Sequence, residues 1–411
     1  MQKGKQTKKG ETMAKEQESQ PPGIFRGAII GAVALITVFA AASAPIPLYS
    51  HYQVTIGLST ADVSQTVVSY LVGVIAVLFF AGSLSDASGR RPVVVASLIC
   101  GAVGCVLFMF LQDGTMLQLA RFIQGMSCAL SMSATSAFVI DCTSERHRTF
   151  GMTIASTGYL IGLTVGSLGI GLFATVSDEY GLVFAALAII MCANAVSLLF
   201  TRETVTHRIT LRKAVKPMIS VPKHLRNLMP IAAGGYISTW CIGFFFQSLS
   251  APTSVDYFSA TDPLIPSLVL ALANAPSAIG GPISARIGTK SSLIGGYIIM
   301  FASCIVMWVV MIAGLLVPFL LLEIVFAIST GMILSSSLHM LIGASLPEEN
   351  AGVVSLANFT GYVGSTIVST IMTALSASLN LATVFALIVL MAAISVVPGA
   401  VGVLKAKRGA A

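Results

Sequence analysis

The chain has 411 residues, of which 55% are hydrophobic and only 9% are charged, and its mean hydropathy is +0.90. A water-soluble protein of this length could not cover its surface with so few charged side chains, so the composition excludes a soluble globular domain. The net charge of +7 does not indicate nucleic-acid binding, because the basic residues are spread among many loops and are not gathered with aromatic residues on one surface.

Residues 1–23 are polar and rich in Gln, Lys and Glu, and we expect them to form a disordered tail. Twelve apolar segments follow, each close to the roughly 20 residues that a membrane-spanning helix needs. The predicted spans are 28–49, 63–84, 93–111, 116–140, 149–173 and 182–200, then 228–249, 264–285, 292–313, 317–340, 353–375 and 382–404. The sequence therefore predicts an all-α integral membrane protein with the lipid bilayer as its surroundings.

Basic residues mark one side of this predicted membrane protein. Of the 23 Lys and Arg, 22 lie in the two tails or in loops that follow even-numbered spans. Basic loops stay in the cytosol during insertion, so we expect a multi-pass protein of the inner (cell) membrane with both termini cytosolic. The expected order is a tail (1–23), a six-helix bundle (24–201), a cytosolic linker (202–227), a second six-helix bundle (228–404) and a tail (405–411).

Two short repeats indicate that the two halves are related. The spacing of Gly82 and Gly89 after the second span recurs in Gly281 and Gly288 after the eighth. The tripeptide Thr-Gly-Tyr recurs at 157–159 and 360–362, near the start of the fifth and eleventh spans. Parallel repeats of this kind form two bundles with a substrate path between them.

The loop after the second span carries the motif Gly82-Ser-Leu-Ser-Asp-Ala-Ser-Gly-Arg-Arg91. This motif resembles the signature Gly-x-Leu-x-Asp-x-x-Gly-Arg-Arg/Lys of the major facilitator superfamily. Glycines permit a tight turn and a close approach of helices, and charged residues next to it can form strong ion pairs. The resemblance implies a fold of twelve transmembrane helices in two pseudo-symmetric six-helix bundles, which work by alternating access.

The same resemblance implies a latch at the cytosolic surface. In that family the motif's aspartate, here Asp86, faces the inner end of the eleventh span. Arg90 pairs with an acidic residue that ends the fourth span, for which Asp141 is the candidate. The expected latch residues are Gly82, Asp86, Gly89, Arg90, Arg91 and Asp141.

Two charged residues lie inside predicted spans. Arg121 begins the segment Arg-Phe-Ile-Gln-Gly of the fourth span, which looks like the Arg-x-x-x-Gly pattern of proton-coupled members of the superfamily. An arginine in hydrocarbon costs ~2.5 to 3.5 kcal/mol on insertion scales, so it faces a wet cavity or a partner, or else snorkels to the interface. Glu323 of the tenth span falls within one residue of the equivalent position, so the two residues could face one cavity from opposite halves.

We predict that Arg121 and Glu323 carry proton coupling, with Glu323 as the group that is protonated. Burial raises the pKa of a carboxyl and a nearby cation lowers it, which brings titration into a useful range. The alternative for Glu323 is a structural hydrogen bond near the outer rim.

The glycines of the fifth span have two explanations. Gly158, Gly162 and Gly166 resemble the glycine-rich signature of the family's antiporters, but Ser167 stands where that signature has a proline. Close helix packing through small residues at four-residue spacing explains the same pattern.

Polar and aromatic residues within the spans predict the lining of a substrate cavity. In the seventh span Tyr236, Trp240 and Phe244 recur every four residues, which places them on one helix face. The full predicted lining is Gln124, Ser131, Tyr236, Trp240, Phe244, Gln247, Asn274, Asn358 and Tyr362. These side chains suit a bulky amphiphilic solute, and the alternative is an aromatic stripe that faces lipid.

Patterns of catalytic chemistry are missing from the sequence. It has no His-Glu-x-x-His, no Asp-Asp-x-x-Asp and no phosphate-binding loop, and its seven cysteines are scattered without metal-ligand spacing. We therefore expect no enzyme, no metal and no cofactor.

The predicted function is secondary active transport, namely proton-coupled efflux (antiport) of a small amphiphilic drug or metabolite. The alternatives are an uptake symporter or facilitator and, behind these, a membrane enzyme. The expected partners are a small-molecule substrate, protons and lipid, with no nucleic acid, and we expect a monomer.

Overall fold

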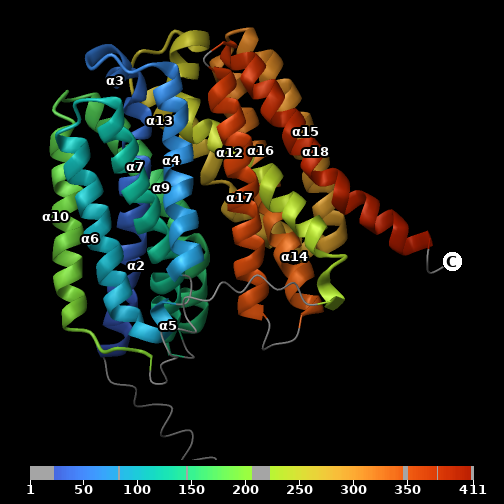
Figure 1. The fold of residues 1–411 in the computed structure, drawn as a ribbon, viewed down its shortest axis with the longest axis horizontal. Helices are drawn as coiled ribbons and strands as arrows, with labels where there is room; N and C mark the ends of the chain where they lie inside the picture. Colours follow the sequence, from blue (N-terminus) through green and yellow to red (C-terminus); the bar gives the residue numbers. More distant parts are fainter. Residues whose placement is uncertain are drawn as a thin grey trace, which may run out of the picture.

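The computed structural model describes residues 23–81, 84–144, 147–205, 223–345, 350–376 and 378–408. Across these ranges the chain is helical and has no β-strand. Two groups of helices stand side by side, α2 to α10 coloured blue to green and α12 to α18 coloured yellow-green to red (Figure 1). Within the described residues, eleven helices are long and apolar enough to cross a membrane, and α17 adds a helix of 27 residues. The predicted all-α membrane fold is confirmed.

The first group begins with the helix of the first span and ends before the linker. Its elements are α2 (Gly23–Ser43), η1 (Ile46–Leu48), α3 (Tyr49–Thr55), α4 (Thr60–Ala81), α5 (Leu84–Ser88), α6 (Arg90–Met109), α7 (Gly114–Leu130), η2 (Ser131–Thr135), α8 (Ser136–Asp141), α9 (Arg148–Ala174) and α10 (Gly181–Leu199). Helix α2 packs on α9, and α7 packs on both α4 and α6.

The second group has the same plan. Its elements are η4 (Lys223–Leu225), α12 (Met229–Phe258), α13 (Leu264–Asn274), α14 (Ser277–Ile287), α15 (Thr289–Ile312), α16 (Leu316–Ala344), α17 (Asn350–Ser376) and α18 (Leu381–Arg408). Helix α12 packs on α16, α17 and α18, while α16 also packs on α15 and α14. Helix α18 runs past its predicted end at Leu404.

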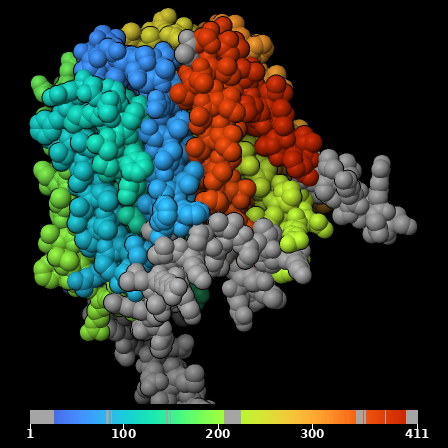
Figure 2. Space-filling model, in the orientation of Figure 1, coloured from blue at the N-terminus to red at the C-terminus, as the bar shows by residue number. Residues whose placement is uncertain are grey.

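The helices bury one face and expose an equally apolar face. In α10, Phe184, Met191 and Leu198 are buried at seven-residue spacing, whereas Ile189 and Val196 on another face are exposed. Figure 2 shows how the helices form a continuous outer surface on the side in view. Helices satisfy their backbone hydrogen bonds internally, so an apolar exposed face of this kind suits lipid.

Three predicted spans are not single regular helices. The first, expected to run unbroken to Tyr49, instead ends as α2 at Ser43, and Pro45 and Pro47 lead into η1 and α3. The eighth span divides into α13 and α14 at Pro276. Proline lacks a backbone N–H and its ring blocks the preceding turn, which explains both breaks. The fourth span contains a π-helical segment, η2, between α7 and α8, and such segments often mark functional sites.

The sequence repeats occupy equivalent places in the two groups. Gly89 precedes α6 with φ 107° and Gly288 precedes α15 with φ 84°, so both turns use a conformation that favours glycine. Gly158 packs against α2, and Gly361 packs against α12 beside Trp240. The fifth span therefore packs on the first span, and the eleventh span packs on the seventh in the same way. Gly281 lies within α14, whereas Gly82 lies outside the described residues.

Contacts join the two bundles at the end opposite the basic loops. The Ser376 hydroxyl donates to the Ser64 hydroxyl at 3.0 Å, and the Ser167 hydroxyl donates to the Ser267 carbonyl at 3.4 Å. Helices α4 and α17 lie side by side along this boundary (Figure 1).

Candidate functional site

A cavity of about 120 Å³ lies between the two bundles. Its aromatic lining comes from both of them, with Phe39, Tyr70 and Tyr159 on one side and Trp240, Phe244, Phe326 and Tyr362 on the other. Its polar lining is Thr239, Gln247, Asn274, Ser277 and Thr330. Every lining side chain is therefore uncharged at neutral pH. The cavity can hold an aromatic solute by ring contacts and a few hydrogen bonds.

Five of the nine predicted cavity residues line this space: Trp240, Phe244, Gln247, Asn274 and Tyr362. Helical spacing explains the α12 members, and the Trp240 ring lies 4.3 Å from the Tyr362 ring, centroid to centroid. Asn274 is the last residue of α13, directly before the break at Pro276. The break places this polar side chain at the boundary between the bundles.

Four predicted residues do not line the cavity. The Gln124 amide donates to the Ala41 carbonyl at 2.8 Å, and the Ser131 hydroxyl donates to the Thr135 hydroxyl at 3.1 Å. Tyr236 is buried edge-on against Trp240, with ring centroids 5.3 Å apart, and Asn358 is half-buried elsewhere on α17. Spacing along a helix identified polar residues, but the packing of each helix decided which of them face the cavity.

The sequence analysis also missed lining residues. Tyr159 and Tyr362 are the tyrosines of the repeated Thr-Gly-Tyr, and they line the cavity from opposite bundles. The repeat was therefore a usable signal for Tyr159. Tyr70 and Phe326 carry no comparable signal.

Arg121 is fully buried, so it does not snorkel. Its Nη1 donates to the Ala42 carbonyl at 2.7 Å and to Gln124 Oε1 at 2.9 Å, and its Cζ lies 4.9 Å from the centre of the Tyr70 ring. Ala41 and Ala42 belong to the last turn of α2, whose carbonyls lack partners within the helix. Arg121 and Gln124 thus bind the end of α2 where Pro45 prevents it from continuing.

Glu323 is also fully buried, and neither of its carboxyl oxygens has a hydrogen-bond partner among the described residues. It lies between Phe319 and Phe326 on one face of α16, and both rings pack against Phe246 of α12. An unpartnered polar group in such a place is rare and calls for an explanation.

In this arrangement of the bundles, Arg121 and Glu323 do not face the central cavity together. Neither residue lines the central cavity. Tyr70, whose ring contacts the Arg121 guanidinium, lines the cavity, and so does Phe326, one turn from Glu323. Their matching sequence positions therefore did not decide which way either side chain points.

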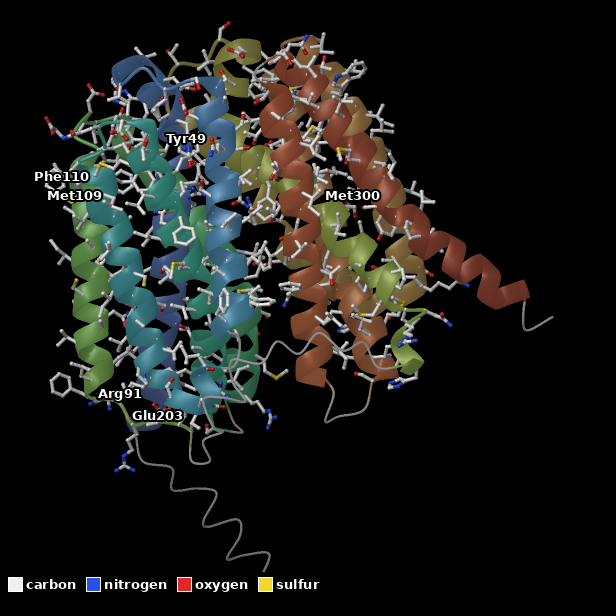
Figure 3. The ribbon with its side chains drawn as sticks, in the orientation of Figure 1. Tyr49, Arg91, Met109, Phe110, Glu203 and Met300 are labelled. Carbon is white, nitrogen blue, oxygen red and sulfur yellow. The ribbon has the colours of Figure 1, made fainter. Side chains whose placement is uncertain are left out.

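At the end of the molecule that carries the basic loops, Arg90 Nε donates to Asp141 Oδ2 at 2.6 Å. This is the contact that the family resemblance implied. The Thr204 hydroxyl donates to the same carboxyl oxygen at 3.1 Å. Glu203, which the sequence analysis missed, accepts the backbone N–H groups of Arg90 at 2.9 Å and Arg91 at 3.1 Å. Figure 3 shows Arg91 and Glu203 together at this end of the molecule.

These described contacts join the first bundle to the start of the linker, and none of them involves the second bundle. They join the turn before α6, the end of α8 and the first residues of the linker. The side chain of Asp86 lies outside the described residues, so its contact with the eleventh span stays a prediction.

A second cavity, of about 610 Å³, opens between the bundles at the opposite end. Its lining includes His51, Asp178, Tyr180, Asp256 and Asp262, none of which the sequence analysis singled out. Burial and the neighbouring Asp178 carboxylate raise the pKa of Tyr180. This second cavity is acidic, unlike the central cavity.

Comparisons with known proteins agree with this architecture. The family model described as Major Facilitator Superfamily matches residues 31–369. The quinolone resistance protein NorA of Staphylococcus aureus is 25% identical over 155 residues, which are 37% of this chain and 39% of that protein. The tetracycline resistance protein, class H, of Pasteurella multocida is 32% identical over 123 residues, which are 30% of each chain. The matched region thus covers about two fifths or less of each relative's length.

Solved structures are similar over nearly the whole chain. A bacterial homologue of the human lysosomal transporter Spinster, inward-facing and unoccupied, aligns with a TM-score of 0.68 at 13% identity and covers 93% of this chain and 96% of its own. The human organic anion transporter MFSD10 aligns with a TM-score of 0.62 at 14% identity, covering 93% and 100%. At these identities the likeness shows the fold.

Proposed function

Because the chain belongs to the Major Facilitator Superfamily, and is thus a multi-pass membrane transporter and not an enzyme, we propose that it exports a small amphiphilic aromatic solute in exchange for protons. The observation that carries the substrate class is the central cavity, whose lining is aromatic, sparsely polar and uncharged. Flat aromatic solutes gain ring contacts there, and the lining has no charged side chain that would lose its partner or its hydration.

The size of the cavity supports transport by movement of the bundles. Ligand pockets usually measure about 300 to 1,000 Å³, and the central cavity measures about 120 Å³ in this arrangement. A drug-sized solute therefore needs the bundles to separate at one end. The names of the quinolone and tetracycline resistance proteins support quinolones and tetracyclines as the first solutes to test.

Glu323 is the proposed proton carrier. A carboxylate buried without a partner costs several kcal/mol relative to water, so the arrangement with Glu323 enclosed suits its protonated form. Release of the proton favours an arrangement in which the carboxylate meets water or hydrogen-bond donors. This difference links proton release to movement of α16 against its neighbours.

Transport in proteoliposomes tests the proposal, with tetracycline and a fluoroquinolone as the probe solutes. An imposed pH gradient is expected to drive accumulation, and Glu323→Gln is expected to abolish the part that depends on the gradient. Glu179→Gln is the matched control, because Glu179 is exposed in the loop before α10. Flux that is unchanged when the gradient is collapsed would refute proton coupling, and flux driven only in the opposite direction would favour uptake.

A further inference from the structure

The seam between α12 and α16 contains more unpartnered polar groups than Glu323 alone. Among the described residues, the hydroxyls of Ser250 and Thr253 are buried and have no hydrogen-bond partner. Both residues belong to α12, and their side chains are at most 2% exposed. Buried polar groups without partners are destabilising, so two hydroxyls and a carboxyl of this kind in one seam indicate a shared role.

Ring contacts show that Glu323 faces α12. The Phe246 ring lies 6.4 Å from the Phe319 ring and 5.7 Å from the Phe326 ring, centroid to centroid. Phe319 and Phe326 are the residues four before and three after Glu323, which places all three on one helix face. The carboxyl therefore lies in the seam, within a turn of the level of Phe246.

Ser250 and Thr253 lie on the matching face of α12. They follow Phe246 by four and seven residues, the spacing that keeps side chains on one face. The Phe258 ring, further along α12, lies 5.0 Å from the Phe319 ring. The stretch of α12 between Phe246 and Phe258 thus runs past Phe319, next to Glu323.

Neighbouring hydroxyls behave differently. Ser254 donates to the Ser250 carbonyl at 2.8 Å, and Ser329 donates to the Phe326 carbonyl at 2.6 Å. Such bonds to the preceding turn are the usual way in which a helical serine is satisfied. Ser250 and Thr253 make none of these bonds, so their protons are available to another acceptor.

We propose that Ser250 and Thr253 are positioning residues for Glu323, whose hydroxyls donate hydrogen bonds to its carboxylate, directly or through one water, after it releases a proton. This inference rests on the proposed proton-carrying role of Glu323. In the arrangement described here the donors and the acceptor lie in one seam without bonding. The inference requires a shift of α16 along α12 that brings the hydroxyls to the carboxylate.

Other ionisable groups do not replace these donors. The helices packed against α16 are α12, α13, α14, α15 and α17. Their ionisable residues are Tyr236, Cys241, Asp256 and Tyr257 in α12, Arg286 in α14, Lys290, Tyr297 and Cys304 in α15, and Tyr362 in α17. Within the described residues none of them bonds to Glu323. Among the described residues of α12, Ser250 and Thr253 are the buried side-chain donors that have no hydrogen-bond partner.

Infrared titration of the purified protein in lipid vesicles tests the inference without requiring transport. The carboxyl band of Glu323 is identified by its absence in Glu323→Gln. Ser250→Ala and Thr253→Val are each expected to move the midpoint of its titration to higher pH by about one unit. The free energy of one hydrogen bond to a charged group is roughly equivalent to a shift of one pKa unit. Removal of a donor leaves the carboxylate less stable, which sets the sign.

Matched variants separate this effect from general damage. Thr253→Ser keeps the hydroxyl and is expected to keep the wild-type midpoint. Ser254→Ala and Ser329→Ala remove hydroxyls that are already bonded, and they are expected to leave the midpoint unchanged. Equal midpoints in Ser250→Ala, Thr253→Val and wild type would overturn the inference, and so would a Glu323 band that does not titrate. A band that shifts as expected, combined with transport that is insensitive to Glu323→Gln, would refute only the proposed proton coupling.

Discussion

The carboxylate of Glu203 accepts the backbone N–H of Arg91 at 3.1 Å, and through this contact the start of the linker binds the first turn of α6. A second N–H, from Arg90, reaches the other carboxyl oxygen at 2.9 Å. The N-terminus of a helix carries unpaired N–H groups and a partial positive charge, so a carboxylate there is stabilising. The linker between the bundles is thus attached to the turn that carries the family motif.

Glu203→Ala is expected to release this attachment. The first-turn N–H groups of α6 lose their acceptor, and a helix-terminal carboxylate contributes about 0.3 to 2 kcal/mol. Hydrogen exchange followed by mass spectrometry should show faster exchange in peptides covering Arg90 and Arg91. Glu179→Ala, in an exposed loop at the other end, is the control and should leave these peptides unchanged. Equal exchange in the two variants would contradict the role given to Glu203.

Gly89→Ala is expected to destabilise the same turn. Gly89 has φ 107°, which side chains other than glycine's rarely adopt, and a Cβ there would lie 2.5 Å from Glu203 Oε2. Residues forced into such a conformation cost about 1 to 3 kcal/mol. Thermal unfolding in detergent should give a lower midpoint. Gly295→Ala is the control, because a Cβ at this position of α15 meets nothing within 4 Å; a common midpoint for the two variants would sink the prediction.

Gln124→Leu is expected to lower the stability of the protein more than Gln247→Leu does. The change leaves the Ala41 carbonyl and one Arg121 donor unsatisfied in a buried place, at about 1 to 3 kcal/mol for each group. Gln247→Leu is the matched comparison, since Gln247 lines the central cavity. Urea or thermal unfolding should separate them, with Gln124→Leu the less stable. The reverse order would show that Gln124 does not hold the end of α2.

Trp240→Ala and Tyr362→Ala are expected to weaken binding of tetracycline about 2- to 10-fold each, which corresponds to the 0.5 to 1.5 kcal/mol of an aromatic contact. Both rings line the central cavity and pack on each other. Quenching of tryptophan fluorescence serves for Tyr362→Ala, and equilibrium dialysis serves for both. Phe110→Ala, whose ring is exposed at the end of α6, is the control (Figure 3). Unchanged affinity in both cavity variants would place the solute elsewhere.

The sequence predicted those features that depend on where apolar and basic residues lie along the chain. Apolar segments of spanning length and the one-sided placement of Lys and Arg gave the membrane fold, because lipid excludes both exposed backbone and charge. The prolines at 45, 47 and 276 were equally visible, yet the breaks in the first and eighth spans were not predicted. A proline can be accommodated within a helix, as Pro252 is in α12, when neighbouring helices satisfy the backbone.

The family motif predicted the contact of Arg90 with Asp141. The repeated Thr-Gly-Tyr also indicated Tyr159 as a cavity residue, although the sequence analysis did not draw that conclusion. Only the tertiary structure showed that Arg121 binds the end of α2, that Glu323 has no partner among the described residues, and that Gln124 and Tyr236 lie outside the cavity. Hydropathy and spacing fix which residues share a helix face and how deep they lie. The direction of that face follows from the rotation of each helix, which is set by packing against partners far away in the sequence.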